Sequence, residues 1–188
     1  MSDPPLHLDT ARLEAGLDEI RCAPADGGRL ELIVARPRSD ERVVLDVGQL
    51  DREAGLVGDC WKAAFDASGD PGYLDAQVTV MNARAAALVA GPRERWPLAG
   101  DQLYVDLDLS GENLPPGARL AIGDAVLEVT AEPHTGCRKF VSRFGLDAMK
   151  FVNSEVGRAL NLRGINTRVV KAGEVRVGDR AERWKGDA

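Results

Sequence analysis

The chain has 188 residues, of which 44% are hydrophobic and 29% are charged, and its formal net charge at pH 7 is -6. This length is typical of one soluble globular domain, so we expect residues 1–188 to form a single domain with its own hydrophobic core. An acidic chain lacks the basic stripe or patch with which proteins bind phosphate backbones, so we expect no nucleic-acid partner.

In the N-terminal half, the apolar patterns predict five elements: a helix over 8–20, a strand over 30–35, a strand within 38–47, a strand over 76–81 and a helix over 83–90. The first two strands can pair as a hairpin. Asn82 can cap the second helix, because its side chain can accept a hydrogen bond from a free amide of the first turn. The segment 55–75 is rich in glycine and predicts an irregular loop.

In the C-terminal half, alternating apolar and polar residues predict a half-buried strand over 103–110. Two hairpins follow from the turn dipeptides Gly123-Asp124, within 118–131, and Ala172-Gly173, within 166–179. Between them, apolar residues recur every three or four positions over 147–160, which predicts a helix.

Many short strands with polar turns and only a few helices favour a mainly β fold of the α+β class. A barrel or closed sheet is expected, because closure removes the unpaired edges of a sheet.

The N-terminal sequence MSDPPLHLDTARLEAG has neither a basic region nor the apolar run of a signal peptide. No stretch of the chain approaches the roughly 18 consecutive apolar residues needed to span a bilayer. We therefore expect a cytoplasmic protein without a membrane partner. Its three cysteines, Cys22, Cys60 and Cys137, are far apart, and neither a disulfide framework nor a zinc site is indicated.

Cys137 follows a strand and a loop that contains Pro133 and Gly136, and Arg138 and Lys139 come directly after it. Loops at strand ends often carry binding residues, and nearby positive charge favours the thiolate, which is the nucleophilic and metal-binding form. Free cysteine is also among the most buried residue types and often acts as a small hydrophobe. From these residues alone, a reactive thiol and a core thiol both stay open.

Two polar residues are further candidates with an ordinary alternative. His134 can add positive charge or take a proton beside the thiol, or it is simply a loop residue. Asn113 can hydrogen-bond a ligand, or it can bond the backbone of its own turn, as asparagine commonly does.

Several segments in order resemble the MOSC domain, the family named for the C-terminal domain of molybdenum-cofactor sulfurase. These segments are GLVGD at 55–59, QVTVMNARA at 77–85, GENL at 111–114, IGDAVLEVT at 122–130, EPHTGCRKF at 132–140 and RGINTRVVKAGEVRVGD at 163–179. The resemblance covers roughly residues 30–179, and Cys137 stands at the position of the family's cysteine.

The resemblance implies a MOSC-like β-barrel with a few helices and a cysteine associated with sulfur transfer or molybdenum-cofactor binding. It makes Cys137 the candidate catalytic residue and molybdenum ligand, since thiolate is a soft ligand suited to such a metal. The phosphate of the cofactor would need cations and hydrogen-bond donors. The candidate cofactor-binding residues are Arg138, Lys139, Arg168, Asn113, His134 and Arg84.

Three functions are compatible with this resemblance. The protein is a molybdenum-cofactor-dependent oxidoreductase or sulfurtransferase, a sulfur carrier without bound metal, or a non-enzymatic binding module that keeps the fold alone. The first two imply a redox partner or a cysteine desulfurase as partner.

Overall fold

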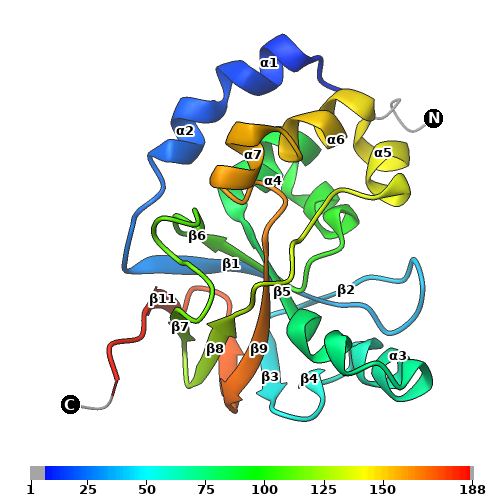
Figure 1. The fold of residues 1–188 in the computed structure, drawn as a ribbon, viewed down its shortest axis with the longest axis vertical. Helices are drawn as coiled ribbons and strands as arrows, with labels where there is room; N and C mark the ends of the chain where they lie inside the picture. Colours follow the sequence, from blue (N-terminus) through cyan, green and yellow to red (C-terminus); the bar gives the residue numbers. More distant parts are fainter. Residues whose placement is uncertain (1–6, 187–188) are drawn as a thin grey trace.

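The computed structural model describes residues 7–186, and its centre is a β-barrel (Figure 1). Hydrogen bonding runs in the strand order β11-β7-β8-β9-β5-β6-β1, and β11 pairs back onto β1 to close the ring. Among the strands of residues 7–186, only β5 and β6 are parallel neighbours, so the barrel is mixed. The barrel strands are β1 (Gly28–Ala35), β5 (Val78–Asn82), β6 (Leu103–Asp106), β7 (Arg119–Ile122), β8 (Ala125–Val129), β9 (Ile165–Lys171) and β11 (Arg180–Arg183).

The residue alternation of each strand divides its side chains between two cores. In β6, Leu103 and Val105 point into the barrel, whereas Tyr104 packs with the helices on the outside. In β1, the side chains alternate between the same two cores after a bulge between Leu30 and Leu32. The expected α+β fold with a MOSC-like β-barrel is therefore confirmed.

A second, small sheet has the order β10-β3-β4. It consists of β3 (Val47–Asp51), β4 (Gly55–Leu56) and β10 (Gly173–Arg176). The edge strand β2 (Val43–Leu45) pairs with β1, as the predicted hairpin requires.

Most helices lie together on one side of the barrel, whereas α3 (Trp61–Ser68) lies at the opposite end near β4 (Figure 1). The helices of the larger group are α1 (Thr10–Ala15), α2 (Leu17–Arg21), α4 (Ala83–Ala90), α5 (Arg138–Phe144), α6 (Leu146–Val152) and α7 (Glu155–Ala159). Two 3-10 helices, η1 (Pro71–Ala76) and η2 (Arg93–Ala99), connect elements. No helix among residues 7–186 is both long and apolar enough to cross a membrane.

Several local predictions are confirmed. Asn82 caps α4 by accepting a hydrogen bond from the amide of Ala85 at 3.0 Å. β7 and β8 form the predicted hairpin around Gly123, whose φ of +53° suits glycine.

Five predictions differ from the structure, and four of them concern single segments. The helix over 8–20 is divided into α1 and α2 at Gly16, and the helix over 147–160 is divided into α6 and α7, with Ser154 capping the second piece. The segment 55–75 is not irregular, because it contains α3 and η1. The strand expected over 103–110 ends at Asp106 as β6.

The hairpin predicted over 166–179 was wrong because its two halves belong to different sheets. β9 pairs with β8 and β5, whereas β10 pairs with β3. The crossing occurs at Gly173, where a Cβ atom would lie 2.6 Å from the carbonyl oxygen of Asp124. Such close backbone contact allows only glycine, so the Ala172-Gly173 signal marks a sheet change rather than a turn.

Candidate functional site

The cysteine loop comprises residues 130–137 and joins β8 to α5. At its start, the hydroxyl of Thr130 donates to the carbonyl oxygen of Asp75 at 2.6 Å. At its end, the amide of Gly136 donates to Oδ1 of Asn153 in the helical layer at 3.1 Å. Cys137 occupies the N-cap position of α5, and its thiol is exposed rather than part of the core.

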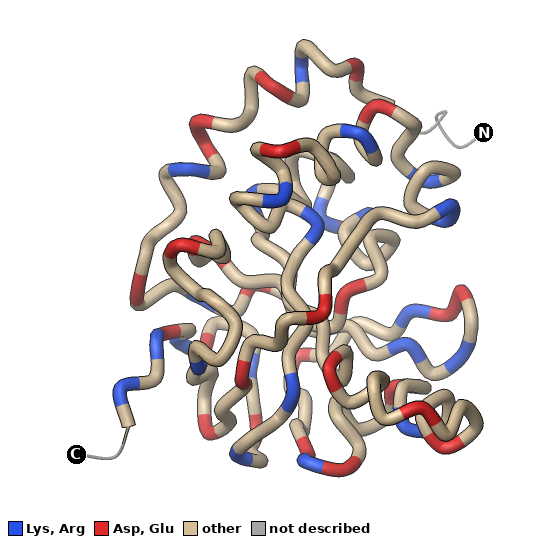
Figure 2. The backbone as a smooth tube through the Cα atoms, in the orientation of Figure 1, with Lys and Arg blue, Asp and Glu red and all other residues tan. Residues whose placement is uncertain are grey.

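Residues 132–135 of this loop form one wall of a pocket of about 450 Å³, which we call the arginine pocket. Its basic lining residues are Arg36, Arg38, Arg42 and Lys139, and its acidic ones are Asp40 and Glu132. In Figure 2, cationic segments gather on the loop between β1 and β2, which supplies Arg38 and Arg42. In the lining of this pocket, cationic side chains therefore outnumber carboxylates, although the net charge of the whole protein is negative.

Arg36 is held rigidly at the edge of this pocket. Its Nε and Nη2 donate to the two carboxylate oxygens of Asp59 at 2.8 and 3.0 Å, and Nη1 donates to the carbonyl oxygen of Gly100. The Asp59 side chain is fully buried and also accepts the amide of Trp61 at the start of α3. Asp59, the last residue of the GLVGD segment, therefore orients Arg36 and also binds the amide of the first residue of α3.

Arg42 lies among other positive charges. Burial is the largest cause of the lowered pKa of Arg42, and the like charges of Arg143 and Arg36 lower it further. Its Nε donates to the carbonyl oxygen of Pro97 at 3.1 Å, and Asp40 is the carboxylate nearby that opposes this lowering. Crowded cations of this kind favour a bound anion, because an anion relieves their mutual repulsion.

Asp40 connects the loop between β1 and β2 to α5. Its carboxylate accepts from Nζ of Lys139 at 3.0 Å and from Nη2 of Arg143 at 2.6 Å. The hydrogen bond from Lys139 is the largest cause of the lowered pKa of Asp40, which is solvent-exposed. Lys139 thus has a protein partner, and it also lines the arginine pocket.

A buried polar cluster lies behind the cysteine loop. Nη1 of Arg163 donates to Oδ2 of Asp101 at 2.6 Å, and Nδ1 of His134 lies 3.4 Å from Oδ1 of Asp101. Burial and then the charge of Arg163 lower the pKa of His134 to about 4, so the imidazole is neutral at pH 7. Within residues 7–186, the Nδ1 and Oδ1 atoms and Nε of Arg163 are buried without a hydrogen-bond partner.

His134 faces two pockets. A neighbouring pocket of about 380 Å³ lies toward α7 and includes Arg158 and Arg163 in its wall. It shares Asn166 and the loop residues 132–135 with the arginine pocket. The cysteine loop is therefore the partition between two cavities.

The structure brings together some of the sequence-predicted residues. His134 and Lys139 line the arginine pocket, but the lining residues of that pocket stop at Thr135 and resume at Lys139. Cys137 and Arg138 are therefore not among the residues that line this pocket. Cys137 follows the wall residue Thr135 by two positions in the chain.

Three other predicted residues have their contacts elsewhere. Arg84 pairs with Asp106 and Glu19. Asn113 donates to the carbonyl oxygens of Ala25 and Asp108, each at 2.8 Å, in keeping with the alternative of a backbone-bonding turn residue. Arg168 pairs with Glu128 on the outer surface of the barrel.

The sequence did not lead us to Arg36, Arg38 and Arg42, which supply most of the positive charge in the arginine pocket. The run from Arg36 to Arg42 contains three arginines in seven residues, and its pattern predicts a turn. That density of arginine in a loop was an available signal for an anion site. Asp101 and Arg163 gave no such signal, because 62 residues separate them in the chain.

Comparison with known proteins agrees with this architecture. The family model described as MOSC domain matches residues 59–182, whereas the comparison with curated proteins gives no match. Among solved structures, the YuaD protein of Bacillus subtilis superposes with a TM-score of 0.59 and 21% identity, covering 82% of this chain and 94% of that one.

YiiM proteins have the same fold. YiiM from Escherichia coli gives a TM-score of 0.53 at 18% identity, covering 85% of this chain and 71% of that chain. YiiM from Geobacillus stearothermophilus gives 0.51 at 12% identity, covering 86% and 74%. With the family match over more than half of its length, the chain belongs to the MOSC domain family.

Proposed function

We propose that the protein binds a molybdenum cofactor in the arginine pocket and uses Cys137 as the thiolate ligand of the metal. The observation that carries this proposal is that one short loop both ends at an exposed thiol, Cys137, and forms a wall of a cation-rich cavity with its residues 132–135. The cofactor is a phosphorylated pterin, and MOSC domains are associated with proteins that handle it.

The donors of the pocket fit such a ligand. Arg38 and Arg42 lie on one loop, and Arg42, whose pKa is lowered by burial and then by the like charges of Arg143 and Arg36, marks a place where a phosphate would be stabilised. Thr79, Asn166 and the edge of the neutral His134 add uncharged polar groups, as a heterocycle requires. When bound, the metal would supply redox chemistry that no side chain of this site can provide.

Three side chains of the protein would have separate roles in the site. Arg36, fixed by Asp59, gives the pocket a rigid positive edge. Cys137 would supply a soft sulfur ligand from the end of the cysteine loop. His134 would hold or accept a proton on Nε2 while Nδ1 faces Asp101.

A second function, sulfur carriage without metal, is favoured by one specific observation. Cys137 is exposed and is not part of the pocket lining, so a second protein can reach its sulfur. In that case the thiolate of Cys137 would attack the outer sulfur of a desulfurase persulfide. The sulfur–sulfur bond of the donor would break, its cysteine thiolate would leave, and Cys137 would carry the persulfide.

The test is to purify the protein from cells that synthesise the cofactor and to measure molybdenum and pterin per chain. We expect near-stoichiometric amounts of both in wild type, loss of metal in Cys137→Ser, and loss of both in an Arg38→Gln/Arg42→Gln double variant. Cys22→Ser is the matched control, because Cys22 is also exposed but is far from the loop along the chain.

Cofactor binding and sulfur carriage predict different results in this experiment. Absence of metal and pterin from wild-type protein contradicts cofactor binding. A persulfide on Cys137, detected by mass spectrometry after incubation with a cysteine desulfurase and cysteine, would then support sulfur carriage. Absence of that persulfide as well would leave the fold as a binding module without this chemistry.

A further inference from the structure

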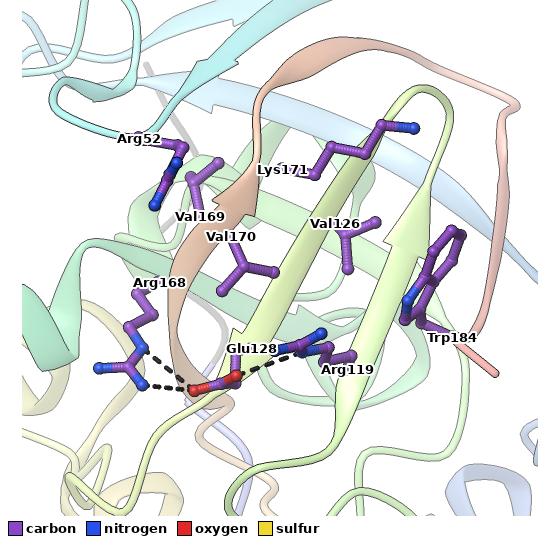
Figure 3. A pocket seen from close by; sticks show the side chains of 9 residues that line it. All are labelled: Arg52, Arg119, Val126, Glu128, Arg168, Val169, Val170, Lys171 and Trp184. Atoms are coloured by element: carbon purple, nitrogen blue, oxygen red, sulfur yellow. Dashed lines mark hydrogen bonds and ion pairs between the residues drawn. The ribbon is translucent and has the colours of Figure 1, made fainter. Parts of the chain in front are cut away.

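A groove of about 580 Å³ lies on the outer face of the barrel, across β7, β8 and β9 (Figure 3). It shares no lining residue with the arginine pocket. We call it the strand groove. Four cations, Arg52, Arg119, Arg168 and Lys171, and one carboxylate, Glu128, line it together with Trp184.

The position of these side chains follows from strand register. Glu128 pairs with Arg119 of β7 on one side and with Arg168 of β9 on the other, so three outward-facing side chains meet. The guanidinium groups of Arg119 and Arg168 bind the carboxylate of Glu128 from opposite sides (Figure 3). Glu128 therefore holds two arginines in fixed positions.

This ion triplet keeps its positive groups accessible. The side chains of Arg119 and Arg168 are 49% and 51% exposed, whereas that of Glu128 is only 16% exposed. Arg119 donates a hydrogen bond to Glu128 from Nε, and Arg168 donates to the same carboxylate from Nε and Nη2. The remaining guanidinium N–H groups are available to an anion.

The rest of the groove adds unpaired charge and an aromatic wall. Among residues 7–186, no carboxylate lies within ion-pair distance of Arg52 or Lys171. Nζ of Lys171 lies 5.9 Å from the ring centroid of Trp184, in a cation–aromatic contact. Val126 and Val170 lie between the ion triplet and Lys171 (Figure 3).

We propose that the strand groove binds a nucleotide-class ligand, an aromatic ring bearing phosphate. The phosphate would contact Arg119, Arg168 and Arg52, and the ring would lie over the valines against Trp184. Four positive charges facing one negative charge, in a protein of net charge -6, indicate an anionic ligand.

Two features decide the size and kind of this ligand. The volume is in the range of small-molecule sites, roughly 300–1,000 Å³. An acidic peptide would use the cations and leave the indole and the valines without a role. A long nucleic acid would extend beyond the groove onto a surface whose overall charge is negative.

The probes for the test are adenosine 5′-diphosphate, pyrophosphate and adenosine, titrated calorimetrically at low ionic strength. We expect the diphosphate nucleotide to bind, and pyrophosphate and adenosine to bind at least about 10-fold more weakly. The double variant Arg52→Gln/Lys171→Gln should raise the dissociation constant about 10-fold or more. Neither side chain has a carboxylate partner within residues 7–186, so this variant should fold, and its thermal transition verifies that.

Three controls make the result specific. Arg29→Gln removes an exposed arginine on β1, outside the groove, and should leave binding unchanged. Trp184→Leu should weaken binding of the nucleotide toward that of pyrophosphate. Cys137→Ser should bind the nucleotide normally, which separates this inference from the proposed function.

Several outcomes would overturn the inference. These are no nucleotide binding at millimolar concentration, equal affinity in Arg52→Gln/Lys171→Gln and Arg29→Gln, or equal affinity for nucleotide and pyrophosphate. Tighter binding of hexaglutamate or of oligothymidylate would replace the small ligand with a macromolecule. Loss of binding in Cys137→Ser would place the nucleotide in the arginine pocket instead.

Discussion

The Nδ1 atom of His134 lies 3.4 Å from the Oδ1 atom of Asp101, and the Asp101 side chain is completely buried. Asp101 also binds the guanidinium of Arg163, so the imidazole faces a carboxylate that is already paired with a cation. Gly164 allows this approach, since a Cβ atom there would lie 3.2 Å from Nδ1 and 3.3 Å from Oδ1. The cysteine loop therefore places a titratable side chain against the buried Asp101–Arg163 pair.

The first prediction concerns pH. The folded state lowers the pKa of His134 from 6.5 to about 4. As pH falls below 6.5, the unfolded chain takes up a proton that the folded protein does not, so the free energy of unfolding decreases until pH reaches about 4. Between pH 7 and pH 5 this costs about 2 kcal/mol.

The measurement is chemical unfolding of wild type and His134→Gln at both pH values. His134→Gln should lack about 2 kcal/mol of the pH-dependent loss. Identical pH dependence in wild type and His134→Gln would refute the buried neutral imidazole.

The second prediction concerns Asp59. Asp59→Asn removes the negative charge from the bidentate contact with Arg36 and leaves the guanidinium with an unpaired charge. We expect the free energy of unfolding to fall by about 3 kcal/mol, measured by denaturant titration. Asp66→Asn is the control, because the Lys62–Asp66 pair is exposed and should contribute less than about 1 kcal/mol.

The third prediction concerns Gly164, whose φ is +108°. A Cβ atom there would lie 2.6 Å from the carbonyl oxygen of Val80 and would crowd the His134–Asp101 contact. Gly58 has a φ of +89°, but a Cβ atom added there would meet nothing within 4 Å, so Gly58→Ala suffers backbone strain alone.

We therefore expect Gly164→Ala to lose at least about 2 kcal/mol more stability than Gly58→Ala. Thermal unfolding of both variants measures the difference. Equal losses would mean that backbone strain, and not the contact with Val80, determines the choice of glycine at position 164.

The fourth prediction concerns the thiols. Cys137 and Cys22 are exposed, whereas Cys60 is half-buried beside Trp61. A thiol reagent should therefore modify Cys137 and Cys22 of the native protein rapidly and Cys60 more slowly, as followed by peptide mass spectrometry. Slow modification of Cys137, at the rate of Cys60, would favour a buried, inert thiol.

The local elements that depend on neighbouring residues could be predicted from the sequence. The cap at Asn82, the strand from residue 30 to Ala35 and the hairpin at Gly123 each depend on residues that are close in the chain. The ordered motifs around Cys137 likewise predicted the family and the barrel. The loop position of Cys137, after a strand and a proline, left a reactive thiol and a core thiol both open, and only the structure places this residue at the surface.

The tertiary structure decided everything that joins distant residues. The closure of β11 onto β1, the transfer of β10 to a second sheet and the contact of Asp101 with Arg163 connect segments that no local pattern relates. Charge alone could not separate Arg168, which lies in the strand groove, from Arg42, which lies in the arginine pocket. Both are arginines near a strand, and only the register and closure of the barrel determine which cavity each one faces.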